Sequence, residues 1–166
     1  ADGNEHSLFY KGLKADIRNA MLSQGLYYLK KEKDTTGFSS QYGWVHAFAH
    51  GGDLLTEVIC HPRFPKSDIA EAFEIIGKIF KRVEIRFTND EDWRLARAFY
   101  EPILRGKIEP SLLTAWLQTV EFPLKEANDF HKFSNFRSCL LEIYLQLDCH
   151  NLLQDDLKKI IQSFHY

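Results

Sequence analysis

The chain has 166 residues, of which 45% are hydrophobic and 27% charged, and its formal net charge is −2. This balance is typical of a globular domain and excludes a disordered chain. The small negative charge gives no general attraction for nucleic acid or an anionic membrane surface, so we expect neither as a partner. The sequence has no apolar run of the roughly 20 residues that span a bilayer and no signal peptide at its start.

The three cysteines are odd in number and not closely spaced, which argues against a disulfide framework and a zinc ribbon and favours a reducing compartment. We therefore predict a cytoplasmic protein. The length suits one domain over residues 1–166. Because the first residue is not Met, the sequence is either a trimmed chain or the C-terminal part of a longer protein.

Apolar residues recur at helical spacing along nearly the whole chain, and the alternation typical of strands is scarce. The segment "VEIRF" (83–87) is the one strand-like candidate. Capping residues, Pro and Gly set the expected helix ends. We predict helices over 8–33 with Ser7 as cap, 44–60, from Ser67, from Asn89 or Asp90 to before Gly106, from Pro110 to before Pro123, 124–147 either whole or broken near Ser134 and Asn135, and 155–164.

Short connections make sequential helices antiparallel neighbours. The helix starts are roughly 20 to 30 residues apart, as in paired-helix arrays of the HEAT or armadillo kind, although no clear repeat is visible. We therefore predict an all-α fold, either an α-α superhelix or an irregular helical array, with about seven antiparallel helices.

A polar stripe runs along the second predicted helix, in the segment "GWVHAFAHGGDLL" and the turn after it. At about 100° per residue, His46, His50, Asp53 and Glu57 fall on one narrow face. The other faces are mainly apolar, and the stripe contains no Lys or Arg. Solvated helix faces usually carry such long charged side chains, so this stripe predicts a fixed polar environment.

Three interpretations of the stripe stay open. As a metal site, His46, His50 and Asp53 bind a divalent ion, although the Glu of the metalloprotease motif is missing. As a cleft, the stripe hydrogen-bonds a polar ligand and offers a histidine for proton transfer. As a structural hub, it ties helices together through buried hydrogen bonds. Gly51 and Gly52, each costing roughly 1 kcal/mol relative to Ala in a helix, predict the close approach of a helix or a ligand.

Two other segments supply candidates for the same site. Glu32 and Asp34 join the stripe if the loop after the first helix folds back onto the second. Arg94, Arg97 and Glu101 lie within helical reach of one another, which favours local surface pairing. The alternative is that Arg94 pairs with a carboxylate of the stripe.

Ordered motifs run through this part of the chain: Glu-x-Asp, then Gly-Trp-x-His-x-x-x-His-x-x-Asp-Leu, then Glu-Asp-x-Arg-Leu-Ala. They resemble a bacterial family known only as domain of unknown function 2785, over about residues 13 to 105. One departure is Thr36, where the family usually has Arg. The matching residues are Glu32, Asp34, Gly43, Trp44, His46, His50, Asp53, Leu54, Glu91, Asp92, Arg94, Leu95 and Ala96.

The resemblance implies an all-helical superhelical fold, a bacterial cytoplasmic setting and no particular activity. It also implies that six polar residues gathered from three helices belong together: Glu32, Asp34, His46, His50, Asp53 and Arg94. We predict a helical binding or scaffold module for an unknown small molecule or protein. The alternative is a hydrolase whose cofactor is a divalent metal on His46, His50 and Asp53. The candidate pocket residues are Glu32, Asp34, Trp44, His46, His50, Asp53, Glu57 and Arg94.

Overall fold

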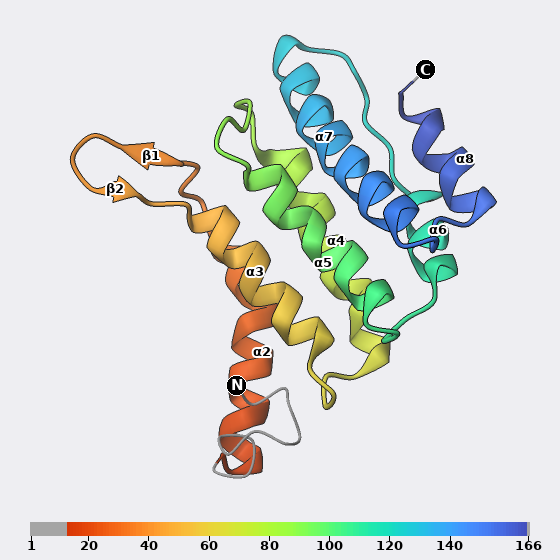
Figure 1. Cartoon of the computed structure of the whole chain (residues 1–166). Helices are drawn as coiled ribbons and strands as arrows, with labels where there is room; N and C mark the ends of the chain where they lie inside the picture. Colours follow the sequence, from red (N-terminus) through yellow and green to blue (C-terminus); the bar gives the residue numbers. More distant parts are fainter. Residues whose placement is uncertain (1–12, 166) are drawn as a thin grey trace.

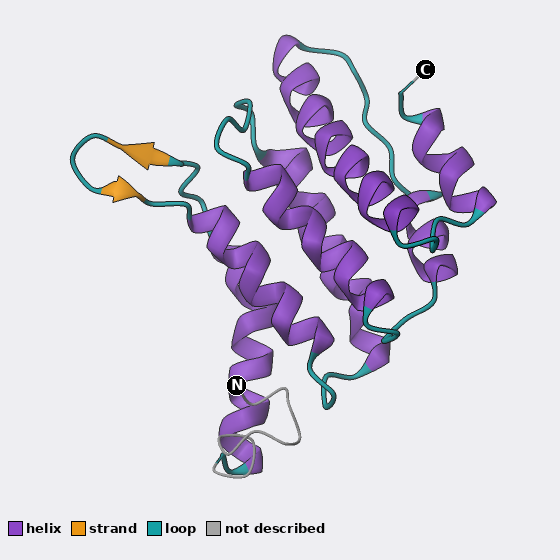
Figure 2. Cartoon of the chain, in the orientation of Figure 1, coloured by secondary structure: helices purple, strands orange, loops and turns teal. Residues whose placement is uncertain are grey.

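The computed structural model describes residues 13–165, which form seven α-helices and one two-stranded hairpin (Figures 1 and 2). The prediction of a mostly helical chain is confirmed. None of the helices in this range is long and apolar enough to cross a membrane. The elements are α2 (Ala15–Lys31), β1 (Phe38–Ser39), β2 (Gly43–Trp44), α3 (Ala47–Cys60), a 3-10 turn (Lys66–Asp68), α4 (Ile69–Arg82), α5 (Glu91–Leu104), α6 (Pro110–Leu117), α7 (Ala127–Cys149) and α8 (Asp155–Ser163).

Helix α3 packs along α5, and α5 packs along α7, so these three lie side by side (Figure 1). Helix α2 contacts both α3 and α4. The glycines of α3 permit this close packing: a β-carbon at Gly52 would lie 2.8 Å from the carbonyl oxygen of Arg94, and one at Gly51 would collide with Leu29 of α2. The predicted close approach at these glycines is therefore confirmed, and the neighbours are helices.

A chain of aromatic rings fills the centre of the core. Phe73 of α4 and Phe99 of α5 have ring centroids 4.8 Å apart, and Phe99 stacks on Trp116 of α6 at 5.0 Å. Phe136 of α7 closes the chain, 6.3 Å from Trp116. All four side chains are buried. Aromatic rings from four helices therefore pack against one another and stabilise the helical core that supports the candidate site.

Several predicted helix ends are confirmed. Asp90 is the N-cap residue of α5, and Gly106, in the left-handed region at φ 65°, follows its end. Pro110 is the first residue of α6. Helix α7 is unbroken through Ser134, which resolves the two alternatives for that stretch. The first helix is shorter than predicted: α2 spans Ala15–Lys31, and the described residues 13–14 and 32–33 are not helical. The predicted start at residue 8 and the Ser7 cap lie outside the described residues.

The predicted start of the second helix is wrong. Trp44 lies in β2, and α3 begins only at Ala47. Phe38 pairs with Trp44 across a tight antiparallel hairpin, and the N–H groups of Val45 and His46 both donate to the carbonyl of Gly37. These bonds from outside the helix hold His46 in the left-handed conformation, at φ 47°. A helical wheel that runs through His46 therefore misplaces its side chain.

Two smaller predictions also fail. Residues 83–87 form no strand, because the side chain of Asn135 accepts from the Phe87 N–H and donates to the Ile85 carbonyl, as a neighbouring strand would. Ser67 is not an N-cap residue. It lies inside the 3-10 turn, where its hydroxyl donates to Asp68, and α4 begins at Ile69.

Candidate functional site

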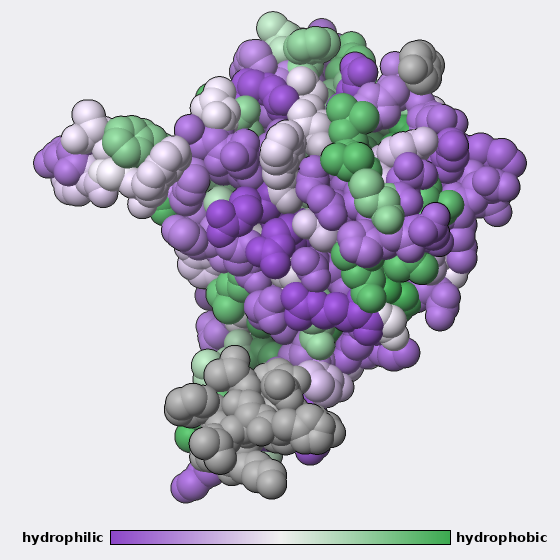
Figure 3. Space-filling model, viewed as in Figure 1, coloured by the Kyte–Doolittle hydropathy of each residue, from purple (hydrophilic) through white to green (hydrophobic). Residues whose placement is uncertain are grey.

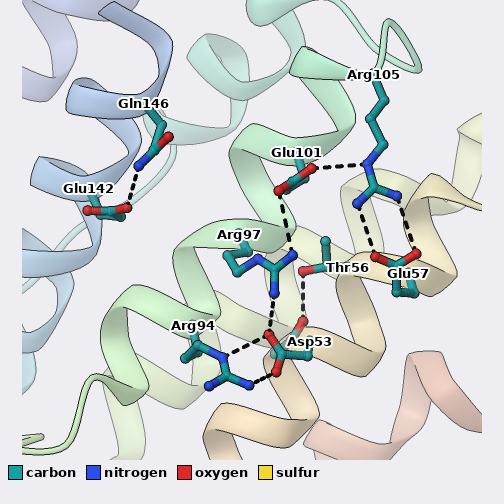
Figure 4. Close-up of polar contacts among 10 residues, drawn as sticks. Asp53, Thr56, Glu57, Arg94, Arg97, Glu101, Arg105, Glu142 and Gln146 are labelled. Carbon is teal, nitrogen blue, oxygen red and sulfur yellow. Dashed lines mark hydrogen bonds and ion pairs between the residues drawn. The ribbon is translucent and has the colours of Figure 1, made fainter. Parts of the chain in front are cut away.

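The C-terminal part of the predicted stripe, Asp53 and Glu57, forms a series of ion pairs between α3 and the arginines of α5 and its end (Figure 4). Asp53 accepts from the Arg94 Nε at 2.9 Å and from the Arg97 Nη1 at 2.8 Å, and Arg94 also reaches its second oxygen. The prediction that Arg94 pairs with a stripe carboxylate is confirmed. We name these residues and those that continue the series the charge ladder: Arg94, Asp53, Arg97, Glu101, Arg105 and Glu57.

The upper half of the charge ladder is more exposed. Glu101 bridges Arg97 at 3.6 Å and Arg105 at 3.0 Å, both at helical i, i+4 spacing. Arg105 in turn donates two hydrogen bonds to Glu57, and these lower the pKa of the Glu57 carboxyl. The predicted local pairing of Arg97 with Glu101 is thus present as well.

The charged groups of the charge ladder are paired with one another. Three carboxylates alternate with three guanidinium groups, so the charges balance within the series. Partly exposed ion pairs contribute about 0.2–1 kcal/mol each. The arrangement can orient α3 against α5, which is the role that the structural-hub interpretation assigns to Asp53.

Among the described residues, no hydrogen bond or ion pair joins either histidine of the stripe to the charge ladder. His50 is exposed on α3, and its ring centroid is 6.1 Å from that of His46. His46 directs its Nε2 toward Glu91 of α5, 3.8 Å from the Oε1 atom, and this nitrogen is buried without a hydrogen-bond partner. Glu91 is 2% exposed, and its other oxygen accepts the Asn89 N–H.

The metal interpretation finds no support in this geometry. Asp53, its predicted oxygen ligand, is bound to two arginines. Across residues 13–165 no group of three or more His, Cys, Asp or Glu side chains is placed to hold a metal ion. Of the three residues predicted to bind a divalent metal, Asp53 is paired with arginines, His46 faces Glu91, and His50 is exposed.

Glu32 and Asp34 serve the turn that leads from α2 to the hairpin. Glu32 accepts the N–H groups of Lys33 and Asp34, and the Asp34 contact lowers the pKa of Glu32. Asp34 accepts the Thr36 N–H at 2.8 Å. Among the described residues, neither carboxylate bonds to the charge ladder or to a histidine. Their carboxylates thus stabilise the turn instead of joining the predicted site.

One open pocket of about 500 Å³ lies between α2 and α3. Of the eight predicted pocket residues it contains only Glu32, whose carboxylate accepts the Tyr28 hydroxyl at its edge. Met21 and Leu54 supply much of its apolar wall, and both are exposed. The predicted polar pocket centred on His46, His50 and Asp53 does not coincide with it.

The hairpin carries a group of exposed aromatic side chains. Phe38, Tyr42 and Trp44 are 57%, 74% and 61% exposed, and the rings of Phe38 and Trp44 meet edge to face at 5.0 Å. The Trp44 ring also lies 4.5 Å from that of His46. In the space-filling view the hairpin projects from the body of the molecule (Figure 3). Large exposed aromatics on a projecting segment are typical of interaction surfaces.

Sequence reasoning missed a second polar cluster, between α5, α7 and the segment before α5. Arg86 donates to Asn135 and Ser138, each at 2.6 Å, and to Asp92 at 3.3 Å. Burial raises the pKa of Asp92. A signal was present: Asn135 interrupts an otherwise apolar helix face, and such a polar residue usually satisfies buried backbone groups.

Arg82 was missed as well. From the end of α4 its guanidinium donates to the carbonyls of Leu29, Lys30 and Glu32, at 2.7, 3.1 and 2.7 Å. These carbonyls are at the C-terminal end of α2, where the helix leaves them without internal partners. No local pattern marks Arg82, because its partners are about 50 residues away in the sequence.

The fold and the site together define a mostly helical protein with an ion-pair network between α3 and α5 and a projecting aromatic hairpin. A family model described as "Protein of unknown function (DUF2785)" matches residues 6–145, and the chain belongs to this family. The predicted resemblance is therefore confirmed. No curated protein and no solved structure matches the chain.

Proposed function

We propose that this chain is a binding module that recognises a polypeptide partner through the aromatic hairpin, residues 38–44. The single observation that carries the proposal is the exposure of Phe38, Tyr42 and Trp44 on a projecting segment. Tyr and Trp are enriched among residues that dominate binding energy at interfaces. Two of the predicted pocket residues, His46 and the exposed His50, border this surface.

The chemistry of the hairpin indicates the kind of partner. Residues 38–44 contain no charged side chain and offer three aromatic rings, two serine hydroxyls and a glutamine amide. Such a surface suits an apolar polypeptide segment that also hydrogen-bonds, and it gives no basis for recognising a phosphate or another strongly charged group. Binding should therefore depend only weakly on salt concentration.

Selection from a library of random displayed peptides tests this proposal. We expect the wild-type chain to select a peptide sequence with apolar anchor residues, and synthetic copies to bind with a micromolar Kd, as measured by calorimetry. Trp44→Ala should weaken binding at least about tenfold, since truncating a central aromatic residue costs 1.4 kcal/mol or more.

Trp93→Ala is the matched control, because Trp93 is 52% exposed on α5 but lies outside the hairpin. It should leave the Kd unchanged. Failure to select any peptide, or equal binding by wild-type and Trp44→Ala chains, would contradict the proposal.

We also propose that the helices form a paired array of the HEAT kind. Contacts from α3 to α5 to α7, together with contacts from α2 to α4 to α6, support this arrangement. A cytoplasmic location is supported by the three cysteines, which are all free. Small-angle scattering and fractionation of cells that express the untagged chain test these two statements.

A further inference from the structure

We propose that His46 and Glu91 form a pH-dependent latch that fastens the aromatic hairpin to the start of α5. The latch concerns the attachment of the hairpin and does not require a ligand. Its consequence for partner binding rests on the proposed function of the hairpin, so the latch is tested without a ligand.

The backbone around His46 is held from both sides. Its N–H donates to the carbonyls of Thr36 and Gly37, at 3.1 and 3.3 Å, and its own carbonyl accepts the His50 N–H at 2.8 Å. The left-handed conformation that results, at φ 47°, is unfavourable for a residue other than glycine. This backbone arrangement directs the imidazole toward α5 and fixes its distance from Glu91.

The hairpin base, His46 and the start of α5 meet at the Glu91 carboxylate. A β-carbon added at Gly37 would lie 2.6 Å from the Glu91 Oε1, so the base of the hairpin passes close to this carboxylate. The same oxygen is 3.8 Å from the His46 Nε2, which is too far for a hydrogen bond. A buried nitrogen without a partner thus faces a buried carboxyl group across a short gap.

Three groups face the imidazole from the elements packed against it. From α5 comes the Glu91 carboxylate, and from β2 comes the Trp44 ring, 4.5 Å away, which can attract a cation through its face. From α3 comes His50, whose ring is 6.1 Å away and whose charge on protonation would oppose that of His46. His50 is exposed, so solvent screens this repulsion.

Histidine side chains ordinarily change charge between about pH 5 and 8. A protonated His46 carries a hydrogen on Nε2 and can close the gap to Glu91 as a charge-assisted hydrogen bond. The hairpin is then bound to α5 more firmly in mildly acid solution. At higher pH the neutral imidazole lacks this charge-assisted bond, and the attachment of the hairpin to α5 is weaker.

Amide hydrogen exchange of the full chain, followed by NMR, tests the latch. The reporters are the N–H groups of Val45 and His46, whose bonds to Thr36 and Gly37 close the base of the hairpin. These bonds open more often when the His46 side chain is not fastened to Glu91, because the base then loses its support from α5. After correction for intrinsic exchange rates, we expect protection to be about fivefold higher at about pH 5.5 than at about pH 7.5. An unchanged protection in the wild-type chain would overturn the latch.

Glu91→Gln keeps the shape and the acceptor but removes the charge, so its protection should be equal at both pH values. His50→Gln is the matched control, because it removes the neighbouring exposed histidine and should keep the difference. If circular dichroism shows that Glu91→Gln does not fold, His46→Asn replaces it, since Asn tolerates the left-handed conformation. A pH difference that persists in either variant would also refute the latch.

Discussion

The two ends of the predicted stripe differ sharply in how their polar groups are satisfied. Asp53 accepts hydrogen bonds from two arginines, whereas the His46 Nε2 is buried without a partner, 3.8 Å from Glu91. Asp53 is in a regular helix, and His46 is in a left-handed conformation. The paired Asp53 stabilises the contact between α3 and α5. The unpaired His46, on a constrained backbone, can gain a hydrogen bond if its surroundings change.

The largest expected effect comes from forcing α3 and α5 apart. Gly52→Ala places a β-carbon 2.8 Å from the Arg94 carbonyl, a backbone atom that cannot turn aside. Although Ala favours a helix by about 1 kcal/mol, we expect the free energy of unfolding to fall by about 2 kcal/mol in urea titrations. Ser111→Ala, at an exposed position of α6, is the control and should change it little. Undiminished stability of Gly52→Ala would show that the helices do not need this contact distance.

A smaller effect is expected at the paired end of the stripe. Asp53→Asn keeps the size of the side chain but removes the charge that binds Arg94 and Arg97. Because this network is partly exposed, the free energy of unfolding should fall by about 1 kcal/mol at low salt and by less at 1 M salt. Asp148→Asn removes an exposed carboxylate from the end of α7 and is the charge-matched control. Equal losses in the two variants would remove the special role of Asp53.

The smallest effect is expected at the exposed end of the charge ladder. Hydrogen bonds from Arg105 lower the pKa of Glu57 in the folded chain below its ordinary value of 4.5. The stability that this pair contributes is therefore present above pH 4.5 and is lost as the pH falls below it. A double-mutant cycle with Glu57→Gln and Arg105→Gln should give a coupling of a few tenths of a kcal/mol at neutral pH, which disappears in acid. A coupling that grows in acid would contradict this assignment.

Local patterns predicted much of the fold but only part of the site. Pro110 and Asp90 mark helix starts through chemistry that acts within one turn, and these predictions hold. The helical wheel correctly grouped Asp53 with Glu57, because both lie within α3. It failed at His46, where bonds to Thr36 and Gly37 override the helical periodicity. Such bonds depend on the folded hairpin and leave no periodic signal in the sequence.

The same reasoning explains the missed residues. Glu91 was visible as part of a motif, but its meeting with His46 requires the tertiary contact between the hairpin and α5. The sequence marked Asn135 only as a position where a long helix could break. In the structure its side-chain amide accepts the Phe87 N–H and donates to the Ile85 carbonyl. The sequence thus indicates which polar residues matter more readily than which residue each one contacts.

The guanidinium of Arg82 has a consequence for how the molecule opens. By bonding to the carbonyls of Leu29 and Glu32, it closes a non-covalent ring around the whole intervening chain, which includes the hairpin and α3. Both ends of this ring stay anchored when the hairpin detaches from α5. Detachment of the hairpin, as proposed above for the latch, is then a local opening that does not require global unfolding. Because the anchored ends keep the hairpin near α5, it can reattach while the helices stay folded.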